Sequence, residues 1–377
     1  MIILFIEFYA RSGAPRGLQT ELDILAAKYP NISCVVIGAP ISILANTDQK
    51  YVFYSIEAPD LTGLIENPIQ ILIQFFRTLF RILKIARLHN INIIHCNHYN
   101  WSIYANPIGL FLHRPVIVHL KDTFLLQPKL ARFLMKCNPN TKYIAVSKYV
   151  RKIFAQNYNL NKDKMIIIPD GVSPYIFRVL REKEIVKKNN SIEKIFVMIS
   201  RTDPERFIEV FIDMAAMLIQ KNPEFLFAHY GKTSDEKNKI YLEILKQRVK
   251  SLGIQENLKF YSYLNDAHRL ARIYQKAYLT FVTAPRFALP NVAIESMMCA
   301  TPVIAIDAGG NPEVITSENI GTLVAVNSPI AYAKAVEEFT TGKKNYVKTA
   351  MTAAQSVRQR FTDEQQGRRL VKLYQQL

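Results

Sequence analysis

The chain has 377 residues, 49% of them hydrophobic and 21% charged, so it can bury ordinary cores, and its length predicts two domains. Four cysteines without C-x-x-C spacing argue against a disulfide framework and a zinc site, and they fit a reducing cytosol. The formal net charge of +17 favours a phospholipid surface, nucleotide phosphates or nucleic acid as partners, although a merely soluble basic protein would carry the same charge.

The N-terminal segment MIILFIEFYARSG has no basic region at its start, and Glu7 interrupts its apolar run. It therefore predicts a first strand rather than a signal peptide. No apolar stretch reaches the roughly 20 residues of a membrane-spanning helix. We find no aromatic-rich basic module, so a nucleic-acid partner is not expected. These features predict a cytoplasmic protein.

The first half of the chain alternates apolar runs of strand length with helical patterns. Such alternation predicts an α/β fold with a doubly wound parallel sheet. The predicted strands are 2–8, 34–37, 51–56, 91–96, 116–119, 143–146 and 165–168, and the predicted helices are 18–28 and 67–88.

A charged segment, Arg181–Lys194, has almost no large apolar groups and predicts an interdomain linker. A second alternating series follows, and an amphipathic helix over 363–377 ends the chain. We therefore place the two domains at residues 1–185 and 186–362. The later strands are 195–200, 225–229, 258–261, 279–283 and 302–307, and the later helices before 363 are 208–220, 236–252 and 267–276.

The stretch Leu279–Ile315 predicts two consecutive strand–loop–helix units. Asn291 can cap the first helix, and Asn311-Pro312-Glu313 opens the second. Successive units of this kind imply parallel strands, whose carboxyl edge is where ligands bind. Both helix N-termini would direct unpaired N–H groups at this edge, which suits a phosphate. Glu295 lies one turn into the first helix, where its carboxylate can accept hydrogen bonds from sugar hydroxyls.

A second candidate site is the segment Ser200–Arg206, which joins a predicted strand to a predicted helix. Its two guanidiniums, on Arg201 and Arg206, can hold a diphosphate with paired N–H bonds. The alternative is a solvated turn with two surface arginines. We favour the diphosphate site because both motifs fall at the carboxyl edge of one predicted sheet.

These motifs resemble the donor-binding signature of retaining glycosyltransferases of family 4. The matching residues include Leu289-Pro290-Asn291, Glu295, Thr301-Pro302-Val303 and Gly309–Glu313. The family pattern begins with a glutamate and a glycine, which are replaced here by Phe287 and Ala288, and the family's lysine is replaced by Arg206.

The resemblance implies a GT-B fold, in which two Rossmann-like domains with parallel sheets face an interdomain cleft and the last helix crosses back to the N-terminal domain. It implies that Glu295 holds the donor ribose and that Leu289, Pro290 and Asn291 line the donor site. By the same resemblance, Arg201 and Arg206 would stabilise the leaving diphosphate.

Two further candidates lie in the first half. The loop Arg11–Arg16 resembles the family's glycine-rich loop and places Gly13 and Ala14 beside the donor, although a lone glycine in a loop is more commonly a simple turn. His119 ends a predicted strand and, by resemblance, contacts the donor sugar; a satisfied core histidine is the alternative. His95 and His98 lack a predicted third ligand, so no metal site is expected.

The segment Gln74–Leu88 carries Arg77, Arg81, Lys84 and Arg87 at helical spacing among apolar residues. A helix of this composition can lie on an anionic membrane. The alternative, which we favour on sequence alone, is an ordinary packed helix with a solvated basic face.

Together these features predict a retaining glycosyltransferase that uses a UDP-, GDP- or ADP-sugar and no metal. Its acceptor would be a glycan or a lipid-linked saccharide, and it would be cytoplasmic, with peripheral attachment to the inner face of the membrane as an option. Two alternatives stay open. One is a sugar-nucleotide epimerase of the same fold, and the other is a non-catalytic subunit that binds a nucleotide sugar.

Overall fold

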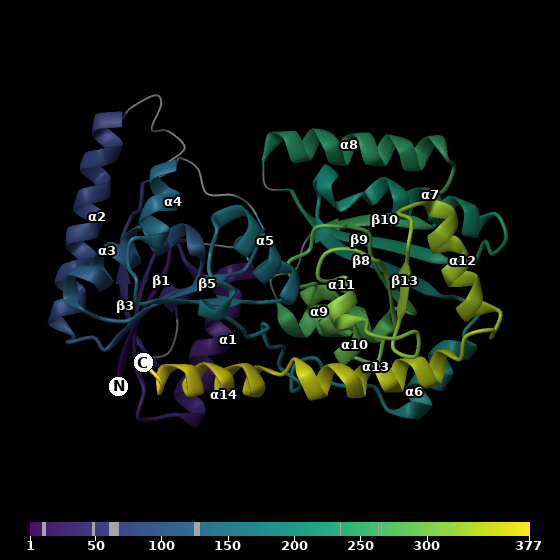
Figure 1. Ribbon diagram of the computed structural model, residues 1–377. Coiled ribbons are helices and arrows are strands. Elements are labelled where there is room, and N and C mark those ends of the chain that lie inside the picture. The colour runs from purple at the N-terminus through teal and green to yellow at the C-terminus, as the bar shows by residue number, and fades with distance from the viewer. Residues whose placement is uncertain are drawn as a thin grey trace. The chain divides into compact units, whose positions relative to one another are not determined.

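The computed structural model describes residues 1–9, 13–46, 50–59, 68–123, 129–233, 235–262, 264 and 266–377. The chain divides into two compact units (Figure 1). The N-terminal unit comprises Met1–Gly171 together with Asp363–Leu377, and the C-terminal unit comprises Val172–Thr362. The last helix therefore belongs to the same unit as the first strand.

The N-terminal unit is built on a seven-stranded parallel sheet in the order β3-β2-β1-β4-β5-β6-β7. Its strands coincide with the apolar runs, because a strand covered on both faces is buried along most of its length. The strands are β1 (Ile2–Glu7), β2 (Ser33–Gly38), β3 (Val52–Ser55), β4 (Ile93–Cys96), β5 (Val116–Leu120), β6 (Thr141–Ala145) and β7 (Met165–Ile167).

Helices cover this sheet, and apolar residues of α1 and α14 share a core with β1, β2 and β4. Gly367 of α14 lies where a Cβ atom would collide with Ile24 of α1, so only glycine permits this close helix contact. The helices of the unit are α1 (Gly13–Lys28), α2 (Pro68–Leu88), α3 (Ser102–Leu112), α4 (Lys129–Lys136), α5 (Lys148–Tyr158) and α14 (Asp363–Tyr374).

The C-terminal unit contains a six-stranded parallel sheet in the order β10-β9-β8-β11-β12-β13. Its core joins apolar residues of β8, β9 and β11 to those of α7 and α12. The strands are β8 (Ile195–Arg201), β9 (Leu226–Lys232), β10 (Leu258–Ser262), β11 (Leu279–Val282), β12 (Val303–Ile306) and β13 (Thr322–Val324). The helices are α6 (Glu182–Asn190), α7 (Ile208–Ile219), α8 (Glu236–Ser251), α9 (Ala267–Lys276), α10 (Asn291–Met298), α11 (Asn311–Val314), α12 (Pro329–Thr340) and α13 (Tyr346–Arg360). Two parallel αβ sheets confirm the predicted fold class.

The prediction of a linker over Arg181–Lys194 is wrong. Most of this segment forms α6, which packs against α13 inside the C-terminal unit. Ile185 is fully buried and anchors the helix, while charged side chains occupy its outer face. Because α6 buries a single apolar side chain among charged ones, its sequence shows little of the hydrophobic periodicity that predicts a helix.

The predicted helix starts in the stretch Leu279–Ile315 are shifted by one residue. Pro290 precedes α10 as its cap residue, and Asn291 is the first helical residue, with an exposed side chain. Gly310 likewise precedes α11, and the Asn311 side chain is buried and donates to the carbonyl of Ile306 at 3.0 Å. Because α11 has only four residues, it offers a single turn rather than a full helix dipole.

Among the helices of the described residues, none combines the length and the apolar character needed to cross a membrane.

Candidate functional site

The order of the strands reverses between β8 and β11 in the C-terminal sheet. In open parallel sheets, ligands bind beyond the carboxyl ends of the strands at such a reversal. Arg201 is the last residue of β8, and the loop 283–290 follows β11. Both sequence motifs of this half therefore converge on the reversal point of one sheet.

Two arginines share one carboxylate at this edge. Asp203 forms an ion pair with each of them, with Oδ2 at 3.1 Å from Arg201 Nε and Oδ1 at 3.6 Å from Arg206 Nε. Arg201 is half exposed, whereas the Arg206 side chain is only 14% exposed. Burial and then the neighbouring charge of Arg201 lower the pKa of Arg206, but a guanidinium keeps its proton at neutral pH. The trio therefore carries a net positive charge.

The loop after β11 is attached to this arginine pair. The hydroxyl of Thr283 donates to the backbone carbonyl of Arg206. The Arg206 guanidinium also lies over the ring of Phe287, 4.7 Å from its centroid, within the range of a cation–π contact. Phe287, which occupies the place of the family's first glutamate, thus contacts one of the two predicted diphosphate-binding side chains.

Gly309 and Gly310 hold the same loop from the β12–α11 side. Gly309 has φ of 62°, and a Cβ atom there would lie 2.7 Å from the carbonyl oxygen of Pro285. The Gly310 N–H donates to the carbonyl of Phe287 at 2.8 Å. These glycines allow two backbone segments to approach closely, so their role in this structure is to shape the loop.

Glu295 faces α9. Its Oε2 accepts a hydrogen bond of 2.9 Å from the hydroxyl of Tyr274, which is fully buried. A carboxylate has more acceptor sites than this one bond uses. Of the other predicted donor-site residues, Leu289 and Pro290 are buried and Asn291 is exposed.

The N-terminal sheet reverses its order between β1 and β4, and polar residues that sequence analysis did not select gather there. Glu7 ends β1 fully buried, and its carboxylate accepts from the Tyr9 N–H at 2.8 Å and from Trp101 Nε1 at 3.2 Å. The Asn97 amide also donates to it. Burial raises the pKa of Glu7 despite these donors.

His98 and Asp122 form a second polar pair near this edge. His98 Nε2 lies 2.9 Å from Asp122 Oδ2, and the hydroxyl of Tyr99 donates to Asp122 Oδ1 at 2.6 Å. The only sequence signal for Glu7 and Asp122 was their position directly at or after a strand end.

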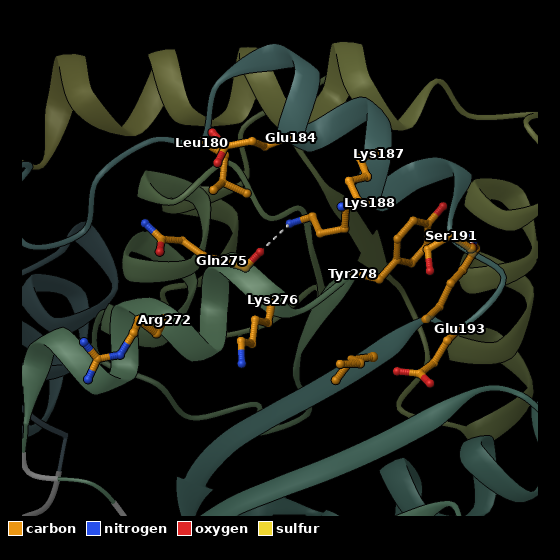
Figure 2. Close-up of a pocket in the computed structure, with 12 residues that line it drawn as sticks. Leu180, Glu184, Lys187, Lys188, Ser191, Glu193, Arg272, Gln275, Lys276 and Tyr278 are labelled. Carbon is orange, nitrogen blue, oxygen red and sulfur yellow. Dashed lines mark hydrogen bonds between the residues drawn. The ribbon is translucent and has the colours of Figure 1, made fainter.

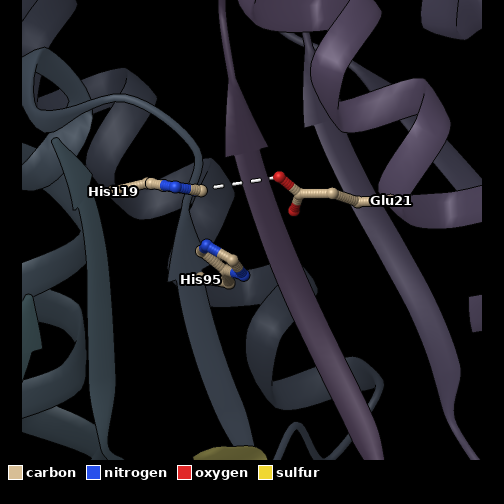
Figure 3. Close-up of side chains that lie close together, drawn as sticks. All are labelled: Glu21, His95 and His119. Atoms are coloured by element: carbon tan, nitrogen blue, oxygen red, sulfur yellow. Dashed lines mark ion pairs between the residues drawn. The ribbon is translucent and has the colours of Figure 1, made fainter. Parts of the chain in front are cut away.

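His119 is fully buried, so it does not line an open surface in this structure. Figure 3 shows it pointing toward Glu21 of α1, with His119 Nδ1 at 3.8 Å from Glu21 Oε1, and His95 of β4 close to both. Burial lowers the pKa of His95 to about 3 and that of His119 well below its usual value, so both rings are neutral. Contact between His119 and a sugar would require the side chains that cover it to move.

Lys121 is the cation of this buried cluster. Its Nζ lies 3.2 Å from Glu21 Oε1 and 3.5 Å from Asp170 Oδ1. Burial opposes its charge, but the two carboxylates outweigh burial and raise its pKa.

Ligating atoms of Glu21, His95 and His119 lie within 4.8 Å of one another, the arrangement of a three-residue metal site. The ammonium of Lys121 already compensates Glu21, and a divalent cation beside it would face strong repulsion. The cluster is therefore best described as a buried ion pair with two neutral histidines.

The remaining sequence candidates are in α1. Gly13 and Ala14 lie in its first turn, because α1 begins five residues earlier than predicted and includes part of the predicted loop. Their surroundings, like residues 10–12, lie outside the described part of the structure.

A separate hollow lies beside α6 and α9, at the amino end of β8 (Figure 2). Its volume is about 500 Å³, and charged residues of both signs line it, among them Lys187, Lys194, Arg272, Glu184 and Glu193. Lys188 donates to Thr301 Oγ1 at 2.9 Å and to the carbonyl of Gln275 at 3.4 Å, and burial lowers its pKa to about 7. None of the residues selected from sequence lines this hollow.

Comparisons with known proteins identify the family of this chain. A family model described as "Glycosyl transferases group 1" matches residues 181–356, and one described as "Glycosyltransferase Family 4" matches residues 42–175. The chain belongs to the group 1, family 4-like glycosyltransferases, and its fold is GT-B, as the resemblance implied.

Curated relatives are distant. An uncharacterized glycosyltransferase of Methanocaldococcus jannaschii is 27% identical over 201 residues, which cover 52% of this chain and 49% of that protein. Mannosylfructose-phosphate synthase of Agrobacterium fabrum is 28% identical over 173 residues, covering 44% of this chain and 38% of the relative. The chain thus spans about half or less of the length of these two relatives.

Solved structures match over the whole chain. HepE of Anabaena in complex with UDP has a TM-score of 0.82 at 18% identity, and the alignment covers 100% of both chains. Sucrose-phosphate synthase of Thermosynechococcus elongatus has a TM-score of 0.78 at 17% identity, with 100% of this chain and 98% of the other covered. At such identities, these similarities establish the fold.

Proposed function

We propose that this protein transfers a sugar from a nucleoside-diphosphate sugar to an acceptor, with retention of the anomeric configuration. The observation that carries the proposal is the cluster of Arg201, Asp203 and Arg206 at the reversal point of the C-terminal sheet. The net positive charge of this cluster suits a diphosphate, which gains negative charge as the sugar leaves. Membership of a glycosyltransferase family supports the proposal.

In this proposal, the two guanidiniums bind the diphosphate, and Glu295 accepts hydrogen bonds from the ribose hydroxyls. The side chain of Tyr274 fixes the Glu295 carboxylate through its hydrogen bond. Because the arginines supply positive charge at the diphosphate, we propose that no divalent metal is needed, so that EDTA should leave the rate unchanged.

UDP is the first nucleotide to test, because HepE, a structural relative, was crystallised with UDP and with UDP-glucose. GDP and ADP are the alternatives. For the acceptor we propose a glycan or a lipid-linked saccharide bound by the N-terminal unit, where Glu7, Asn97, His98 and Asp122 gather at the sheet edge. Neutral sugar hydroxyls suit these amide and carboxylate groups.

The test has two stages. Isothermal titration calorimetry with UDP, GDP and ADP should detect binding of one of them. Release of that nucleoside diphosphate from its sugars should then depend on an added acceptor, and NMR of the product should show the anomeric configuration of the donor. The absence of binding to all three nucleotides would reject the proposal, and an inverted product would reject retention.

One observation favours a second candidate, a nucleotide-sugar-binding subunit without transfer activity. Phe287 stands where the family pattern has a glutamate, and its ring packs against Arg206. A protein of this kind would bind the nucleotide in the first stage and release none in the second, whatever acceptor is offered. An epimerase would instead convert the donor without an acceptor.

A further inference from the structure

Helix α2 packs on the N-terminal unit with one of its faces only. Its buried residues are Ile71, Thr78, Ile82 and Ala86, which recur at helical spacing. Phe75 continues this contact by stacking on Tyr104 of α3, with ring centroids 5.0 Å apart. Packing against the interior of the unit therefore accounts for the apolar residues on one face of α2.

The opposite face is also apolar, and it is exposed. Its side chains follow the spacing i, i+3, i+4, i+7 and i+11, so they form one continuous stripe along the helix. The stripe consists of Ile69, Leu72, Ile73, Phe76 and Phe80, which are 74%, 42%, 47%, 51% and 67% exposed. Large apolar side chains that gather on one exposed face mark an interaction surface, whereas scattered ones need no explanation.

Positive charge lies beside this stripe. The helix has four basic residues, Arg77, Arg81, Lys84 and Arg87, all of them exposed, and no acidic residue. Arg87 also lies over the ring of Phe111 of α3, 5.0 Å from its centroid, and Phe111 is itself 58% exposed. The exposed apolar and basic surface thus extends from α2 to the end of α3, its neighbour in Figure 1.

We propose that α2 docks this protein onto the surface of an anionic lipid bilayer, with the stripe inserted below the headgroups and the cations against lipid phosphates. The helix has 21 residues, or roughly 30 Å at 1.5 Å per residue, but it lacks the apolar character of a spanning segment, so it lies in the plane of the interface. Each cation near an anionic surface adds to the attraction, and burial of the stripe adds the hydrophobic part.

Charge argues against a second copy of the chain as the occupant of this surface. A two-fold dimer brings the same patch of both copies together, so eight cations would meet without an acid from either helix. An anionic lipid surface complements the same charge.

The experiment is co-sedimentation of the 377-residue chain with vesicles of phosphatidylglycerol and phosphatidylcholine, compared with vesicles of phosphatidylcholine alone. The double variant Phe76→Ser/Phe80→Ser tests the stripe, and Arg77→Gln/Arg81→Gln tests the charge. Ile240→Ser/Ile244→Ser is the matched control, because these α8 side chains are equally spaced and are 57% and 59% exposed.

The wild type and the α8 control should sediment with anionic vesicles, and each α2 variant should bind at least about tenfold more weakly. Raised salt should weaken wild-type binding. Failure of the wild type to bind anionic vesicles, or equal binding by the α2 variants, would overturn the proposal. A dimer that the Phe76/Phe80 variant disrupts in light scattering would also overturn it. Melting temperatures near the wild-type value exclude unfolding as a cause, and because no donor is present, the outcome is independent of the proposed sugar transfer.

Discussion

Replacement of Arg206 by alanine tests the proposed diphosphate site most directly. The variant loses a guanidinium that is 14% exposed and lies beside Asp203 and Phe287. Two hydrogen bonds to a charged phosphate are worth about 1.5–3 kcal/mol each, and part of that value is offset because Asp203 already compensates the arginine. We therefore expect a loss of about 3 kcal/mol of binding free energy, or roughly a hundredfold weaker nucleotide affinity.

The cost to stability should be smaller. The variant loses one cation–π contact, worth about 0.5–2 kcal/mol, but Asp203 keeps its ion pair with Arg201. The Thr283 hydroxyl still has the backbone carbonyl of residue 206 as its acceptor. We expect the melting temperature to fall by about 2–4 °C, as is usual for a loss of about 1 kcal/mol in a unit of this size.

The assay is calorimetry with UDP, GDP and ADP, combined with thermal melting. Arg248→Ala is the matched control, since Arg248 also pairs with an aspartate of the same unit, at 2.7 Å from Asp213, but lies on α8. This control should bind the nucleotide like the wild type. Unchanged affinity in a folded Arg206→Ala protein would refute the assignment of the diphosphate to this edge.

Three further predictions concern the C-terminal unit. Phe287→Glu should place a carboxylate against the Arg206 guanidinium and change the order of affinities in a panel of donor sugars; an unchanged order would make this position irrelevant to donor choice. Glu295→Ala should weaken nucleotide binding by about tenfold or more, whereas Tyr274→Phe, which removes only the supporting hydrogen bond, should have a smaller effect. Equal nucleotide affinity of the wild type and both variants would contradict a role for this carboxylate. Burial lowers the pKa of Lys188 to about 7 in the folded state, below the pKa of a lysine in the unfolded chain. Between these two pKa values the unfolded chain binds more protons, so the free energy of unfolding should rise as pH increases from 7 to 10. The wild type should gain up to about 1.4 kcal/mol per pH unit over this range relative to Lys188→Met in urea unfolding. Parallel stability curves for the two proteins would show that folding does not lower the pKa of this lysine.

Sequence analysis predicted the two parallel sheets because their strands are short, apolar and β-branched, and because regular alternation with helices permits few topologies. It also predicted α9 at its observed bounds from helical periodicity, and the structure shows Asp266 capping this helix by accepting from the N–H groups of His268 and Arg269. Both signals are local, so they can be detected without knowledge of the tertiary structure.

The sequence by itself also determined the family, through motifs whose residues lie within a few positions of one another. Arg201, Arg206 and Glu295 were selected in this way, and their roles remain predictions. The replacement of the first glutamate by Phe287 was visible too, but the position of the Phe287 ring under Arg206 was not.

Only the tertiary structure decided which side chains share an environment. Glu21, the pair His119 and Lys121, and Asp170 come from three segments far apart in the chain, and nothing in any one segment indicates the other two. Sequence analysis left His119 as either a contact of the donor sugar or a core histidine, and burial with mutual contact makes it a neutral buried residue beside an ion pair in this structure. Burial depends on all elements that pack around a side chain, and this sum over distant segments has no local signature in the sequence.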